Sequence, residues 1–150
     1  MPDDPRSPEQ RKADVLARLS APVADAWVST AAGDQPFLVP LTAAWFRERL
    51  LIATARSTPT ARNITATGRA RIGFGPTRDV VLIDAVLETT LPVAEAHDEG
   101  AAYAEQSDWD PRTAGDEYVF LVMRPERIQA WREVNELPGR TLMTGGVWKI

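Results

Sequence analysis

Residues 26–46 read AWVSTAAGDQPFLVPLTAAWF. In the second half of this stretch, apolar side chains recur at every second position, as in a strand with one buried face. That face consists of Phe37, Val39, Leu41, Ala43 and Trp45. The segment AGDQP around Gly33 is a turn signal between the two halves. The stretch therefore predicts a β-hairpin.

Further strands are expected on the C-terminal side of this hairpin. Their sequences are LLIATA (50–55), RARIGFG (69–75), DVVLIDAVLETTL (79–91) and EYVFLVMRPERIQAWREV (117–134). We expect the last one to form one long strand or two strands bent at Pro125, because proline cannot donate to a central ladder. The tail GRTLMTGGVWKI is expected to be irregular, with Trp148 packing back. About six short strands in mostly hairpin order predict a mainly β (α+β) fold, an antiparallel barrel or curled sheet.

Three short helices complete the predicted fold. Ser7 is expected to cap a helix that begins at Pro8, and Thr58 a helix of about two turns that Gly68 ends. Residues 94–107 are predicted to form an acidic surface helix weakened by a glycine.

Length and composition favour one ordinary globular domain. The chain has 150 residues and 44% hydrophobic residues, so we expect a single domain over residues 1–150, with residues 1–23 as an N-terminal helical extension. The polar N-terminus and the lack of a long apolar segment predict a cytoplasmic protein with no membrane span. The net charge of −4 argues against a general nucleic-acid or membrane-surface binder.

The sequence offers little for metal binding or for nucleophilic catalysis. It contains no cysteine, which excludes disulfides, thiolate chemistry and cysteine-based metal sites. His97 is the one histidine, and its acidic neighbours one or two residues away point in different directions on a helix. We therefore predict no metal site, and no residue is identified as a catalytic acid or nucleophile.

One basic segment stands out in this acidic chain. Residues 49–78 contain no Asp or Glu and carry six arginines, so this segment has a formal charge of +6 and the remainder −10. At its centre, TARSTPTARN (54–63) combines short hydroxyl side chains with Arg56 and Arg62 at a predicted helix start. Backbone N–H groups, a helix dipole and guanidinium groups are what a phosphate requires. A capped helix with solvated arginines is the competing interpretation.

The order of these elements resembles the pyridoxamine 5′-phosphate oxidase-like superfamily of FMN-binding split β-barrels, which includes flavin- and deazaflavin (coenzyme F420)-dependent oxidoreductases. The resemblance covers about residues 24–148. Its most specific part is the hairpin pattern G-x-x-P-x-x-x-P, followed about fifteen residues later by T-x-x-S and then R-N-I. It implies a six-stranded antiparallel split β-barrel with a few short flanking helices.

The resemblance also implies a cofactor site. Val39, Pro40 and Leu41 would line the flavin ring, and Trp131, in the segment AWR, would lie near the site or reach the partner's cofactor. The residues implied at the ribityl phosphate end are Thr54, Ser57, Thr58, Arg62 and Asn63, with Arg56 compensating from the other side and Thr60 in the same segment. The family usually forms a homodimer with the cofactor at the subunit interface.

Two departures from the family pattern limit the function that is implied. Pro59 and Thr60 stand where many relatives have a basic residue. The segment VPLTAA lacks the basic residues that true pyridoxamine phosphate oxidases use on this strand, so we reject that activity. The leading hypothesis is an FMN-binding redox protein that acts on an unknown small molecule. The alternatives are a coenzyme F420-dependent reductase of the same fold, a non-enzymatic ligand-binding dimer and, as the weakest, a nucleic-acid binder.

Overall fold

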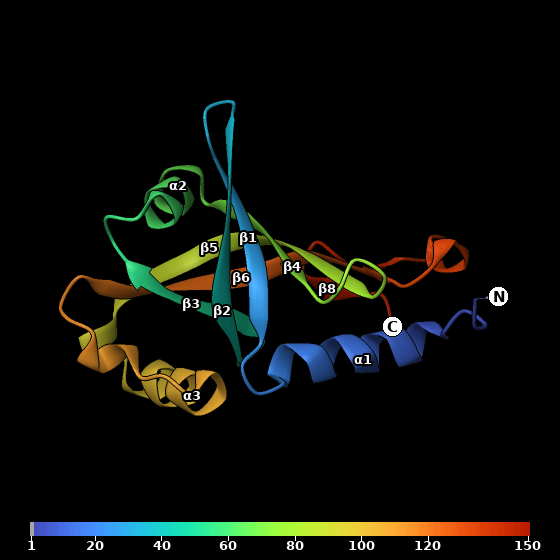
Figure 1. Ribbon diagram of the computed structural model, residues 1–150, viewed down its shortest axis with the longest axis horizontal. Helices are drawn as coiled ribbons and strands as arrows, with labels where there is room; N and C mark the ends of the chain where they lie inside the picture. Colours follow the sequence, from blue (N-terminus) through green and yellow to red (C-terminus); the bar gives the residue numbers. More distant parts are fainter. Residues whose placement is uncertain (1) are drawn as a thin grey trace.

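The computed structural model describes residues 2–150, which form eight strands, three α-helices and three short 3₁₀ turns (Figure 1). The strands are β1 (Asp25–Ala32), β2 (Gln35–Phe46), β3 (Arg49–Ala55), β4 (Arg69–Phe74), β5 (Val80–Pro92), β6 (Tyr118–Trp131), β7 (Thr141–Thr144) and β8 (Val147–Trp148). The helices are α1 (Pro8–Ser20), α2 (Pro59–Thr67) and α3 (His97–Ser107), and the 3₁₀ turns are η1 (Val93–Glu95), η2 (Pro111–Thr113) and η3 (Val134–Glu136).

The strands form one antiparallel sheet that closes into a barrel. Their order is β3-β2-β1-β4-β5-β6-β7-β8, and β3 also pairs with β6. Six strands therefore make a closed ring, and β7 and β8 extend it beyond β6. The predicted six-stranded antiparallel barrel is confirmed, with two strands more than expected.

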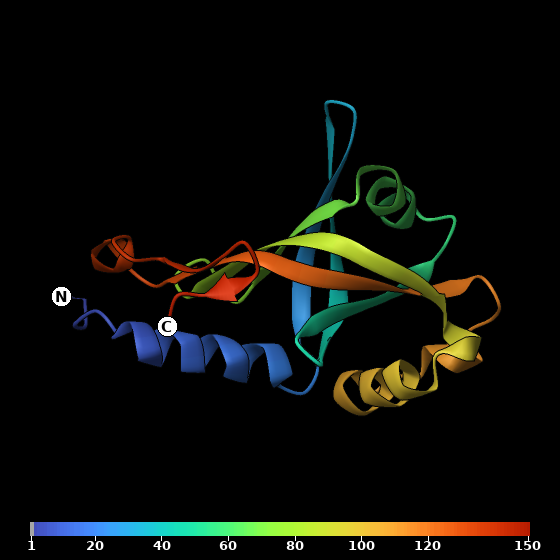
Figure 2. The same cartoon turned by 180° about the vertical axis from the view of Figure 1, so that it is seen from behind.

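The β1–β2 hairpin extends beyond the ring, beside α2 (Figures 1 and 2). β2 pairs with β1 along residues 35–42 but with β3 only from Ala43 onward, so the first part of β2 has one free edge. This free edge explains how β2 accommodates Pro36 and Pro40, since proline is tolerated where no ladder donor is needed. The divergence of β2 from β3 is the split in the barrel.

Pro125 lies within one continuous strand and not at a break between two. Asp84 pairs with Arg127 and Ala85 with Pro125, so Glu126 is an extra residue that forms a β-bulge. A bulge is a position at which a sheet tolerates proline. The single-strand alternative is therefore the one that is found.

The prediction of an irregular C-terminal tail is wrong. Residues 141–148 form the β7–β8 hairpin, which turns at Gly145 and Gly146, both with positive φ. A Gly-Gly pair between two short strands is a hairpin signal that the sequence interpretation did not use. Trp148 packs against the barrel core, as expected.

Two apolar clusters hold the molecule together. The larger fills the barrel and includes Val15 and Leu19 of α1 and Ile64 of α2. The smaller lies between the outer side of β3 and α3, where Tyr103 is 2% exposed. The helix at 94–107 was expected on the surface, but α3 begins at His97 and buries one face because Tyr103 packs on Phe120.

Candidate functional site

The start of α2 is built as the sequence predicts. Thr58 is the N-cap, Pro59 occupies the first turn, and Gly68 ends the helix with φ of 73°. Thr58 Oγ1 accepts from the Ala61 N–H at 3.2 Å and donates to the Ala55 carbonyl at 3.0 Å. Thr54 Oγ1 lies 3.1 Å from the same hydroxyl. Both predicted hydroxyl ligands thus join β3 to α2, and their hydrogen bonds are already used within the protein.

Four other groups at this helix start remain available to an anion. Among residues 2–150, neither the Ser57 nor the Thr60 backbone N–H has a hydrogen-bond acceptor. The Ser57 and Arg62 side chains are exposed, and neither makes a hydrogen bond or an ion pair within the described chain. Two N–H groups, one hydroxyl and one guanidinium at a helix N-terminus are the donors that a phosphate cradle requires.

The other predicted phosphate residues are hydrogen-bonded within the protein or buried. The Arg56 guanidinium donates to the Asp116 carbonyl at 3.2 Å. Asn63 is buried, and its Nδ2 donates to Thr30 Oγ1 at 3.1 Å, which attaches α2 to β1. The Thr60 side chain is also buried.

The charge of the basic segment is concentrated around α2. Three of its six arginines are neutralised: Arg49 pairs with Glu88, Arg71 with Asp84 and Arg78 with Glu133. The other three form no ion pair within the part of the chain that the structure describes; they are Arg56 before α2, Arg62 within it and Arg69 after it. The unpaired positive charge therefore surrounds this helix.

The predicted ring-lining residues alternate between the two faces of β2. Val39 and Leu41 pack against the barrel core, whereas Pro40 is exposed on the outer face, opposite Trp27 of β1. Three consecutive residues of a strand cannot present their side chains to one face. A flat ligand group bound on the outer face would contact Pro40. The same group bound in the split would contact Val39 and Leu41.

A groove of about 620 Å³ lies on this outer face, and we call it the tryptophan groove. Its lining includes Asp25, Trp27, Pro40, Leu41, Tyr103 and Trp109. Ala53 also lines it and is followed directly by Thr54, so the groove and the start of α2 are connected through the end of β3. Burial, with a smaller contribution from the charge of Asp25, raises the pKa of Tyr103 to about 12, so this phenol stays neutral.

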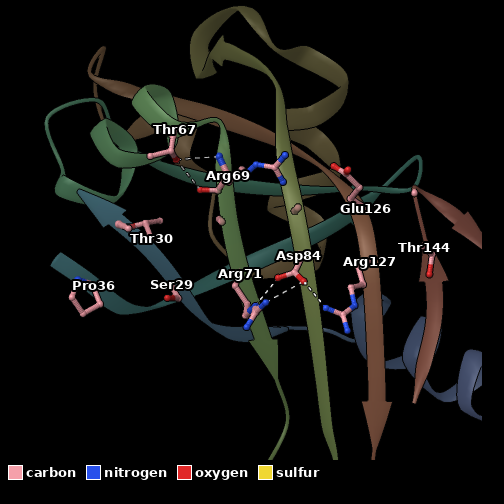
Figure 3. A pocket seen from close by; sticks show the side chains of 14 residues that line it. Ser29, Thr30, Pro36, Thr67, Arg69, Arg71, Asp84, Glu126, Arg127 and Thr144 are labelled. Atoms are coloured by element: carbon pink, nitrogen blue, oxygen red, sulfur yellow. Dashed lines mark hydrogen bonds and ion pairs between the residues drawn. The ribbon is translucent and has the colours of Figure 1, made fainter. Parts of the chain in front are cut away.

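A second groove of about 790 Å³ lies farther along the outer face (Figure 3), and we call it the arginine groove. Its charged side chains are Arg69, Arg71, Asp84, Glu126 and Arg127. Arg71 Nε is 2.6 Å and Arg127 Nη1 3.9 Å from the Asp84 carboxylate, which partly neutralises this surface. None of the predicted cofactor residues is part of its lining.

Trp131 lies far from the start of α2 within one chain. β6 begins at Tyr118, which pairs with Ala55, and ends at Trp131, which pairs with Val80. At about 3.3 Å per residue, the two ends of this strand are on the order of 40 Å apart. The structure therefore does not bring Trp131 together with Thr54–Asn63.

Sequence reasoning did not include Trp27, Tyr103 or Trp109 among the site residues. Trp27 alternates with the buried Ala26 and Val28, so the strand pattern alone places its indole on the outer face. The three aromatic residues come from two distant segments, and only the fold brings them together.

Residues 2–150 contain neither a metal-binding cluster nor a membrane-spanning helix. No three His, Cys, Asp or Glu side chains are grouped so that they could hold a metal ion. No helix in the same range combines the length and the apolar character needed to cross a membrane.

Comparison with known proteins identifies the fold. No protein-family model and no curated protein matches the sequence. Solved structures do match: an F420 reductase is 20% identical with a TM-score of 0.62, over 75% of this chain and 93% of its own. A pyridoxamine 5′-phosphate oxidase-related, FMN-binding protein from Nostoc punctiforme is 15% identical with a TM-score of 0.56, over 89% and 83% of the two chains. A haem-binding protein from Mycobacterium smegmatis is 17% identical with a TM-score of 0.69, over 94% of this chain and 59% of its own.

The chain therefore has the split-barrel fold of these proteins, and the resemblance inferred from the sequence is confirmed at the level of the fold. A shared fold can carry different functions, so the ligand must be argued from the site.

Proposed function

We propose that this protein binds a phosphate-bearing flavin-type cofactor, FMN or the deazaflavin F420, and acts as an oxidoreductase on a small molecule. The observation that carries the proposal is the unused anion cradle at the start of α2. There, the Ser57 and Thr60 N–H groups and the exposed Arg62 guanidinium have no partner in residues 2–150. The fold neighbours that are described as FMN-binding or as an F420 reductase support the choice of cofactor.

Each part of the chain has a definite task in this proposal. The N–H groups of Ser57 and Thr60 bind phosphate oxygens, and Arg62 supplies the countercharge. β2 supplies the wall for the ring, which is either Pro40 on the outer face or Val39 and Leu41 in the split. The bound flavin supplies hydride transfer, while the protein positions it, excludes water and donates hydrogen bonds.

Because positions 59 and 60 carry no basic residue, Arg62 has to supply most of the positive charge for the phosphate. Arg56 is the other nearby cation, and its guanidinium already donates to the Asp116 carbonyl. Arg62 is therefore the main source of charge for the phosphate, and its loss is expected to have a large effect.

A homodimer is part of the proposal, with the cofactor at the subunit interface. The outer face of β1 and β2 leaves Trp27 55% and Leu38 62% exposed. Exposed apolar side chains grouped on a sheet face are typical of association surfaces. In such a dimer, Trp131 would approach the partner's cofactor. This arrangement is compatible with the long distance between Trp131 and α2 of the same chain.

Absorption spectroscopy of the purified and reconstituted protein tests the proposal. A chain that retains added FMN shows the two-band flavin spectrum, and one that retains F420 shows the deazaflavin spectrum. Retention of haem instead, as the Mycobacterium smegmatis neighbour suggests, would appear as a Soret band and would contradict the flavin assignment. Failure to retain any of these cofactors would favour the non-enzymatic binding alternative.

A further inference from the structure

The arginine groove contains acidic and basic side chains that the proposed cofactor site does not use. The β-bulge in β6 places two adjacent residues, Glu126 and Arg127, in its lining. In a regular strand, neighbouring side chains point to opposite faces, so the bulge is what brings both charges into one groove. Bulges that redirect a side chain in this way are over-represented next to functional sites.

Arg69 lies opposite Glu126, on the other side of the groove. Figure 3 shows the Arg69 guanidinium and the Glu126 carboxylate pointing toward each other across β5. Neither side chain makes a hydrogen bond or an ion pair with any of residues 2–150. Opposite charges that face each other without forming an ion pair are matched to a ligand that carries both signs of charge.

A neighbouring row of charges crosses the same three strands. Arg71 of β4 is paired in register with Asp84 of β5, and Asp84 with Arg127 of β6. Arg71 Nε lies at 2.6 Å from the Asp84 carboxylate and neutralises it, whereas Arg127 Nη1 lies at 3.9 Å, beyond hydrogen-bond distance. The charges left free in the groove are therefore those of Arg69, Glu126 and, in part, Arg127.

From this combination we infer that the arginine groove binds a small zwitterion of the α-amino acid class. The ligand's carboxylate pairs with the Arg69 guanidinium, and its ammonium group pairs with the Glu126 carboxylate. An aliphatic ligand side chain lies along Ala70 and Ala85, which also line the groove.

The two charged contacts lie outside both the cofactor cradle and the proposed dimer surface. Arg69 follows the C-terminal end of α2 and the cradle lies at the other end of this nine-residue helix, about 14 Å away. Glu126 is on β6, three strands from β1 and about 14 Å from it. Residues of β1 and β2 form one wall of the groove, but neither Trp27 nor Leu38 is among them. The inference therefore goes beyond the proposed function and does not depend on a bound flavin.

Calorimetric titration with three related probes tests the inference. At pH 7.5, L-norleucine is a zwitterion, hexanoate has the same chain and carboxylate without the amine, and pentylamine has the chain and amine without the carboxylate. We expect L-norleucine to bind the wild-type protein at least about tenfold more tightly than either of the other probes. Each of these lacks one charge-assisted hydrogen-bonding group.

Two isosteric variants assign the contacts. Glu126→Gln should lower the affinity for L-norleucine to that for hexanoate, and Arg69→Gln should lower it to that for pentylamine. Because neither side chain has a partner within residues 2–150, both variants should fold as the wild type does. As a control, Arg78→Gln removes an arginine that is paired with Glu133 outside the groove and should leave all three affinities unchanged.

Two further backgrounds make the outcomes decisive. L-norleucine should bind the Leu38→Asp and Arg62→Ala variants with wild-type affinity, which separates this result from failure of the dimer or of the cofactor proposal. Equal or undetectable binding of the three probes to the wild type, or a Glu126→Gln protein that still prefers L-norleucine to hexanoate, would overturn the inference.

Discussion

At the scale of single residues, Glu136 is the most heavily bonded carboxylate in the molecule as described. Its side chain is 3% exposed and accepts hydrogen bonds from the Arg6 backbone and guanidinium and from the Arg132 N–H. Arg11, also buried, donates to the Glu136 carbonyl at 2.9 Å. This cluster attaches the segment before α1 to the turn after β6.

Replacing Glu136 with Gln should destabilise the protein strongly. The change leaves the guanidinium of Arg6, whose side chain is 9% exposed, without its countercharge, and loss of one member of a buried pair costs about 3 kcal/mol. Urea denaturation measures the free energy of unfolding. As a control, Glu133→Gln breaks the pair with the 78%-exposed Arg78 and should cost less than about 1 kcal/mol. Equal losses in the two variants would show that the cluster is not a stabilising unit.

The same residue predicts how stability depends on pH. Hydrogen bonding from Arg6 lowers the pKa of Glu136 to about 2, below its value in the unfolded chain. The stabilisation is therefore complete above the unfolded pKa and is lost as the pH falls toward 2. In denaturation curves recorded between pH 5 and about pH 2, wild type should lose stability more steeply than Glu136→Gln. Parallel curves would contradict this assignment.

At the scale of elements, the two adjacent residues before α2 have different roles. Thr58 caps the helix, whereas Ser57 makes no side-chain hydrogen bond within residues 2–150. Thr58→Ala should lower the free energy of unfolding by about 1 kcal/mol, and Ser57→Ala by less than about 0.5 kcal/mol. FMN affinity should fall more in Ser57→Ala than in Thr58→Ala, because Ser57 belongs to the cradle. Thermal denaturation and FMN titration of both variants check this, and a Ser57→Ala protein with unchanged FMN affinity would remove Ser57 from the site.

The helices and strands that could be predicted are those determined by neighbouring residues. Thr58 and Gly68 mark the ends of α2 through caps that involve only residues of the same segment. The strand expected over residues 79–91 is found as β5, Val80–Pro92. The β7–β8 hairpin was missed although Gly145 and Gly146 mark its turn, because its strands are short and β7 is held by pairing with β6, which lies outside the segment.

The candidate site could be predicted only in part for the same reason. The anion cradle lies within one segment, so its residue types were visible in the sequence. The tryptophan groove combines Trp27, Pro40 and Trp109 from three segments, and only the register of β1 with β2 and the position of α3 bring them together. The sequence also could not show that Thr54 and Thr58 use their hydroxyls on each other.

At the scale of the whole molecule, the exposed outer face predicts self-association. Sedimentation of the wild-type chain should show a dimer, and Leu38→Asp should raise its dissociation constant at least about tenfold by placing a charge in an apolar contact. Val134→Asp, at an exposed position outside this face, should leave the dimer intact. A monomeric wild-type protein would contradict both the dimer and the proposed contribution of Trp131.

The contribution of the phosphate to binding tests the central claim most directly. FMN and riboflavin share the isoalloxazine ring and differ in the phosphate, so calorimetric titration of both isolates the contribution of the cradle at α2. We predict that FMN binds wild type at least about tenfold more tightly than riboflavin, and that Arg62→Ala abolishes most of this difference. Equal affinities in wild type, or an FMN preference that Arg62→Ala leaves unchanged, would contradict the assignment of this helix start as the phosphate site.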